Sequence, residues 1–227
     1  MSDRQRPQER DVRLSERTKI EGRFGMVLLL LIIAVFFSIS APDEPWALLV
    51  TTVVLALTLS IAMWASSVQP KVVRAWLGFA VLGIGVSIVL AITEAARVAS
   101  GSLAIPSLLL TLVTIGAVAR RIWLHVEISV ITVLGALCIY VLLGLSFAFV
   151  FNAVGDLGPQ PFFASQERGT RSDYMYFSFI TMATVGYGDL TPQGGLGRAL
   201  ATTEGLVGQI YLVTAVAALV GNIGRTR

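Results

Sequence analysis

The sequence has few of the residues from which catalytic and metal-binding sites are built. It contains one cysteine and one histidine in 227 residues, and only 14% of its residues are charged. Cys138 can form no disulfide within the chain and has no metal-ligand partner near it in the sequence. No segment contains a nucleophile motif, a metal-ligand cluster or a phosphate-binding loop. We therefore expect a protein that is not an enzyme and that needs no cofactor.

The charged residues are confined to short stretches between long apolar runs. Hydrophobic residues make up 55% of the chain, and each run is near the roughly 20 residues that a helix needs to cross a membrane. The net charge of +3 does not indicate a nucleic-acid partner, because most basic residues flank these runs and form no patch on a folded domain. The sequence predicts an all-α membrane protein with six transmembrane helices. The six runs are 24–40, 46–66, 75–93, 103–119, 128–151 and 199–223.

The positions of the 17 Lys and Arg residues predict how the chain is oriented in the membrane. Most of them precede the first run, lie in the second and fourth connections or follow the last run. Basic segments are retained on the cytoplasmic side, so both termini should be cytoplasmic and residues 152–198 should face outward. Residues 1–23 have almost no large apolar side chains and should form a cytoplasmic tail without a core. Only residues 224–227 follow the last run, so we expect no cytoplasmic ligand-binding domain.

The first apolar run has a second interpretation, as a cleaved signal peptide. Ser38 and Ser40 before Ala41 make a small-residue cleavage site that follows a basic region. The run is, however, longer than the usual signal-peptide core of about 7 to 15 residues. We therefore expect residues 24–40 to be retained, and the rest of the topology is the same in either case.

The connection between the last two runs contains the most specific motif in the chain. Residues 172–192 read Ser-Asp-Tyr-Met-Tyr-Phe-Ser-Phe-Ile-Thr-Met-Ala-Thr-Val-Gly-Tyr-Gly-Asp-Leu-Thr-Pro. Residues 173–183 predict a short helix with Ser172 as its N-cap and Asp173 in its first turn, where the helix dipole favours a carboxylate. This helix is apolar enough that it should re-enter the membrane from the outer side.

The five residues that follow, Thr184-Val185-Gly186-Tyr187-Gly188, suit a strand whose carbonyl groups all turn toward one axis. Such a strand needs positive φ at some positions, and Gly186 and Gly188 allow it. The carbonyls of the first four residues, with the Thr184 hydroxyl, would replace the water around a K⁺ ion. Val185 and Tyr187 would point outward and pack against the short helix. One chain supplies one such strand, so four copies are needed to surround the ion.

With this motif the sequence resembles the potassium channel family over about residues 128–223. The resemblance implies a pore module of outer helix, re-entrant pore helix, selectivity filter and inner helix. It implies a potassium-selective homotetramer in a cell membrane, in this case a bacterial inner membrane. The partners would be K⁺ ions, three identical subunits and membrane lipid. The expected domains are a tail over 1–23, a four-helix transmembrane domain over 24–122 and a pore domain over 123–227.

The resemblance also assigns roles along the last apolar run. Gly208 stands where the family has the glycine hinge of its inner helix. The side chains expected to line the cavity and the lower gate are Gln209, Leu212, Val216 and Val220.

One side-chain pair is expected to support the filter. The family often ties the filter aspartate, here Asp189, to a Trp or Glu of the pore helix. The corresponding positions in this chain are Tyr176 and Ile180. Only Tyr176 could therefore hold Asp189.

Glu204 is the ionisable residue that lies well inside an apolar run, and such residues are functional candidates. It precedes Gly208 by one helical turn on the same face, so it should pack behind the pore helix within reach of Ser178 or Thr181. Two roles stay open for Glu204. It could be a structural hydrogen-bonding group between subunits, or it could make gating sensitive to protons.

The fourth run lacks the charges of a voltage-sensor helix. Sensing requires several basic residues spaced every third position, and residues 103–119 have none. Arg120 and Arg121 follow the run on different helix faces, where the retention of basic residues in the cytoplasm already explains them. Pro106 should lie at the start of this helix, where a missing N–H costs little. The connection 120–126 is short, so the fourth and fifth helices should be neighbours within one subunit.

Three functions other than that of a potassium-selective channel fit parts of the sequence. The nearest is a weakly selective cation channel on the same scaffold. An alternative from another class is a non-conducting regulatory subunit, against which an intact filter argues. Potassium transporters related to these channels carry four degenerate filter loops in one chain, and this chain has a single loop.

Overall fold

The computed structural model describes residues 24–40, 45–65, 96–123, 130–165 and 168–223, together with Arg74, Gly78, Val81 and Gly85. The described part is almost entirely helical, and one isolated β-bridge joins Phe163 to Pro192. The predicted tail over 1–23 and most of the third predicted helix lie outside it. The helices are Phe24–Ser40, α2 (Pro45–Ala65), α4 (Ala96–Trp123), α5 (Val130–Leu157), α6 (Arg171–Met182) and α7 (Gly195–Ile223).

Three of these helices contain stretches long and apolar enough to cross a membrane, namely Ala104–Trp123, Thr132–Leu157 and Gly195–Ala218. Phe24–Ser40 and the apolar part of α2, Val53–Met63, are shorter. The all-helical class is therefore confirmed for the described residues.

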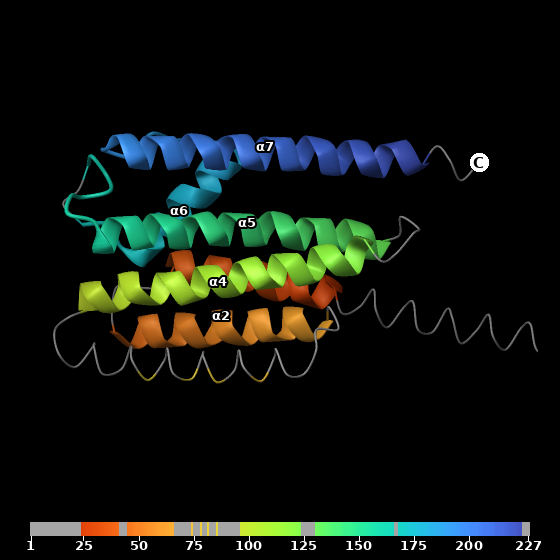
Figure 1. Ribbon diagram of the computed structural model, residues 1–227, viewed down its shortest axis with the longest axis horizontal. Helices are drawn as coiled ribbons and strands as arrows, with labels where there is room; N and C mark the ends of the chain where they lie inside the picture. The colour runs from red at the N-terminus through yellow and green to blue at the C-terminus, as the bar shows by residue number, and fades with distance from the viewer. Residues whose placement is uncertain are drawn as a thin grey trace, which may run out of the picture.

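The long helices lie side by side along the long axis of the molecule, in the order α7, α5, α4 and α2 (Figure 1). The short helix α6 lies between α5 and α7 and packs against both. The helix α4 packs along α5 of the same chain, as the short connection between them predicted. The loop before α6 and the start of α7 lie at one end of the molecule, and the end of α7 lies at the other (Figure 1).

The helix α4 differs from its prediction. It begins at Ala96, so Pro106 lies inside it and the expectation of a helix-start proline was wrong. An internal proline removes one backbone hydrogen bond. The helix nevertheless continues through Pro106 and packs extensively along α5, a tertiary contact that the local sequence does not reveal.

The helix Phe24–Ser40 is part of the folded core. Its residues Phe24, Val27, Leu31 and Ala34 recur at helical spacing and are buried against the other helices. The Cys138 thiol of α5 also donates a weak hydrogen bond to the Phe24 carbonyl oxygen at 3.9 Å. The retention of residues 24–40 in the mature protein stays a prediction.

Candidate functional site

The outer end of α6 is fixed by a capping box. The Asp173 amide donates to Thr170 Oγ1 at 3.0 Å, and the Thr170 amide donates to Asp173 Oδ2 at 2.8 Å. The predicted N-cap, Ser172, was therefore wrong, because Thr170 stands three residues before Asp173 and can exchange both bonds with it. The Ser172 hydroxyl donates instead to the carbonyl of Ile39, which links α6 to the first helix.

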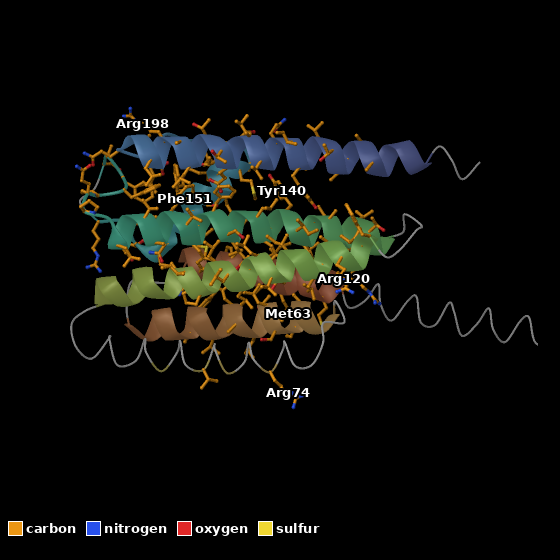
Figure 2. The ribbon with its side chains drawn as sticks, viewed as in Figure 1. Met63, Arg74, Arg120, Tyr140, Phe151 and Arg198 are labelled. Atoms are coloured by element: carbon orange, nitrogen blue, oxygen red, sulfur yellow. The ribbon has the colours of Figure 1, made fainter. Side chains whose placement is uncertain are left out.

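Aromatic side chains of α5, α6 and the loop between them pack the first two turns of α6 against the outer end of α5. Phe162 meets Phe163 edge to face with ring centroids 4.9 Å apart, and Phe151 meets Phe177 in the same way at 5.2 Å. Tyr174 stacks on Phe163 at 5.3 Å. Figure 2 shows Phe151 on α5 at this end of the molecule. The cluster, with capping of the first turn, holds the start of α6 in a fixed position.

The inner end of α6 fits between two glycines. A Cβ added at Gly144 of α5 would lie 2.9 Å from Met182 Cε, and one added at Gly208 of α7 would lie 2.6 Å from Met182 Cγ. The Tyr140 hydroxyl of α5 donates to the Met182 carbonyl oxygen at 3.2 Å. That bond satisfies one of the carbonyls that a helix leaves free at its C-terminus.

A second tyrosine joins the long helices beside this contact. Tyr211 of α7 stacks on Tyr140 with ring centroids 6.2 Å apart, and its hydroxyl donates to the Ala136 carbonyl of α5 at 2.7 Å. Figure 2 shows Tyr140 between α5 and α7. Sequence reasoning missed both tyrosines. The available signals were a hydroxyl inside an apolar run, which must find a partner, and a glycine where helices approach closely.

The segment after α6 has the backbone that its glycines predicted. Gly186 has a φ of 50° and Gly188 a φ of 83°. Thr184 also has a positive φ, of 58°, which was not predicted. The amides of Val185 and Gly186 both donate to the Ile180 carbonyl, at 2.9 and 3.2 Å, so the segment starts as a continuation of the hydrogen bonding of α6.

Residues 183–189 are exposed along their whole length in the single chain. Val185 is 50% exposed and Tyr187 is 73% exposed. The expected packing of these two side chains against α6 is therefore not made within one chain. The surface that would cover them has to come from outside it.

Tyr176 and Asp189, the pair predicted to support the filter segment, lie in contact. The Tyr176 hydroxyl of α6 donates to Asp189 Oδ2 at 2.9 Å. This bond ties the residue after Gly188 back to α6, so both ends of the predicted filter segment are held by that helix.

Glu204 lies in the interior of the helix packing, as predicted, and is 0% exposed. Its Oε1 atom is hydrogen-bonded to the Ser178 hydroxyl of α6, one of the two expected partners. The same hydroxyl lies 2.7 Å from the Gly144 carbonyl oxygen of α5. Three helices thus meet at Ser178.

The residues predicted to form the cavity lie on an unbroken helix. The helix α7 runs through Gly208 without interruption, so the hinge stays a prediction. Gln209, Leu212 and Val216 are exposed in the single chain, and the side chain of Val220 lies outside the described part.

The matches to known proteins fall on this same region. Residues 128–224, which contain α5, α6, the filter segment and α7, match a family described as ion channel. The chain is 33% identical over 87 residues to the inward rectifier potassium channel Kirbac3.1 of Paramagnetospirillum magnetotacticum, covering 38% of this chain and 28% of that protein. It is 38% identical over 96 residues to protein LctB of Bacillus caldotenax, covering 42% of this chain and 65% of the relative. The chain thus spans less than two thirds of either relative.

Proposed function

We propose that the protein is the subunit of a potassium-selective channel that conducts K⁺ passively, because residues 128–224 match a family described as ion channel and the chain resembles proteins named as potassium channels. The observation that supports this proposal most directly is the conformation of Thr184–Gly188. This segment follows α6, is exposed, and has positive φ at Thr184, Gly186 and Gly188. The carbonyls of Thr184, Val185, Gly186 and Tyr187 are the groups that would coordinate K⁺ in place of water.

The exposure of the filter segment supports a tetramer. Non-helical backbone at membrane depth is tolerated only where it is buried in protein or lines a water-filled path. Residues 183–189 meet neither condition in one chain. Four copies around a fourfold axis would meet both, with the carbonyls turned inward and the side chains of Val185 and Tyr187 covered by neighbouring protein.

The surface of α7 also fits this assembly. Leu206, Ile210 and Val213 are large apolar side chains that the single chain leaves exposed. Gln209, Leu212 and Val216, exposed on the same helix, are assigned to the cavity and the lower gate. In this assembly α7 would line the pore on the inner side of the filter.

The positions of the arginines support the proposed orientation. Arg120 lies toward the end of the molecule opposite to Arg198, which is at the filter end (Figure 2). Both basic residues of the last turn of α4, Arg120 and Arg121, therefore lie on the side proposed to be cytoplasmic. We assign the six-helix subunit, with both termini in the cytoplasm, to a bacterial inner membrane.

Purified protein in liposomes that hold a K⁺ or a Na⁺ gradient tests the function. We expect rapid K⁺ flux and little Na⁺ flux. Equal flux of the two ions would indicate a weakly selective cation channel. A well-folded tetramer without flux of either ion would indicate a non-conducting subunit.

Opening of this channel should not depend on a charged fourth helix. Each charge that crosses the field contributes about 2.3 kcal/mol per 100 mV, and residues 103–119 contain no basic residue. Replacement of both Arg120 and Arg121 by glutamine should therefore leave the conductance–voltage relation in planar bilayers unchanged. Steep activation in the parent protein that disappears in the double variant would show that α4 is a sensor.

A further inference from the structure

Glu204, Ser178 and Gly144 form a hydrogen-bonded chain across α7, α6 and α5. The Ser178 oxygen lies within hydrogen-bond distance of two acceptors, the Gly144 carbonyl at 2.7 Å and Glu204 Oε1. Ser178 and Glu204 are both fully buried. Ser178 lies one turn of α6 before Met182. It precedes Ile180 and Thr181, whose carbonyls accept hydrogen bonds from the first amides of the filter segment.

The number of protons available to Ser178 and Glu204 decides which of these two contacts can be hydrogen bonds. A serine hydroxyl has one proton to donate and can accept further hydrogen bonds, whereas a backbone carbonyl oxygen can only accept. If Glu204 were ionised, one of the two contacts of Ser178 would set two lone pairs against each other. If Glu204 is protonated, its hydroxyl donates to Ser178 and Ser178 donates to Gly144, so both contacts are satisfied.

The second carboxyl oxygen of Glu204 leads to the same conclusion. Within the described part of the chain, Glu204 Oε2 is buried and has no hydrogen-bond partner, and no cation bonds to the carboxyl group. An ionised carboxylate without such partners is far more costly to bury than a neutral acid. Among the described residues, Tyr140 of α5 is the titratable group on which the charge of Glu204 would act, and α6 presents the hydroxyl of Ser178.

We propose that Glu204 is a neutral acid at neutral pH and the proton donor of the chain Glu204, Ser178, Gly144, through which it positions the pore helix behind the filter. Its effect on conduction rests on the proposed function. Its protonation state does not. In this arrangement Glu204 acts through its hydrogen bond with Ser178, so it is a positioning residue.

Infrared difference spectroscopy tests the protonation state directly. Wild-type protein minus Glu204→Gln at neutral pH should show the carbonyl stretching band of a protonated carboxylic acid. Ser178→Ala should keep this band but shift it, because the acid loses its hydrogen-bond partner. Asp156→Asn is the matched control at another buried carboxyl, which accepts from Asn152 at 2.9 Å, and it should leave the Glu204 band unchanged. A difference spectrum with only ionised carboxylate bands would overturn the proposal.

Potassium flux tests the positioning role. The Glu204→Gln variant keeps an N–H donor for Ser178, whereas Glu204→Leu removes it and leaves the buried hydroxyl with one partner. We expect flux through the glutamine variant to exceed flux through the leucine variant by about tenfold, the scale of one lost buried hydrogen bond. Equal flux through the two variants would overturn the positioning role. Absence of K⁺ flux in the wild type would overturn the proposed function and leave the spectral result to decide the state of Glu204.

Discussion

Replacing Gly186 with alanine should abolish the preference for K⁺ over Na⁺ while the protein still folds and inserts. Gly186 has a φ of 50°, and a side chain at that φ costs about 1 to 2 kcal/mol in an L residue. The penalty would recur in every subunit around the pore. Among the described residues other than the two flanking ones, no atom lies within 4 Å of the added Cβ, so the effect is conformational rather than a clash within the subunit. The measurement is the ratio of K⁺ to Na⁺ flux in liposomes, expected to fall toward one.

Gly194→Ala is the matched control, because it makes the same chemical change a few residues away. Gly194 also has open space around its Cβ position and does not have a positive φ. It should conduct selectively. Undiminished K⁺ preference in Gly186→Ala would contradict the assignment of Thr184–Gly188 as the filter.

The positive φ values of Gly186 and Gly188 could be predicted from the sequence because the requirement is local. A strand that needs positive φ must use residues that tolerate it, and Gly186 and Gly188 show where those positions are. Thr184 was missed for the same reason, since threonine rarely adopts the φ of 58° that it has here. The backbone around it, bonded to Thr181 and Ile180, imposes that conformation.

The contact of Tyr176 with Asp189 was also predictable, but from the family resemblance rather than from spacing. Once the pore helix and the filter are placed, only one side chain of α6 at the family's positions can reach the aspartate. The contact of Glu204 with Ser178 followed from the position of Glu204 on an apolar helix, where a buried carboxyl needs a polar partner.

The inner end of α6 could not be predicted, because it depends on how three helices pack. Tyr140, Gly144 and Gly208 come from α5 and α7, far from Met182 in the sequence, and meet it only in the folded chain. The expected hinge role of Gly208 was an analogy with the family. The structure adds a second requirement at that position, which is the close approach of α7 to Met182.

Gly208→Ala should therefore destabilise the protein as well as change its opening. The added Cβ would lie 2.6 Å from Met182 Cγ and 3.3 Å from the Met182 carbonyl oxygen. Met182 is itself packed against Gly144, so its side chain has little room to move away. Overpacking of this kind typically costs about 1 to 3 kcal/mol. Thermal unfolding of the purified protein, followed by circular dichroism, should show a lower midpoint.

Gly205→Ala separates this clash from the general effect of alanine in a helix. Gly205 lies on the same helix, and no described atom outside its own stretch of helix lies within 4 Å of an added Cβ. Alanine favours the helix over glycine by about 0.8 to 1.0 kcal/mol, so this variant should be as stable as the parent or slightly more stable. A pure hinge at Gly208 makes a different prediction, since alanine there would change the open probability and leave the unfolding midpoint where it was. An unchanged midpoint in Gly208→Ala, with altered opening, would show that the hinge and not the contact with Met182 explains why α7 has glycine at this position.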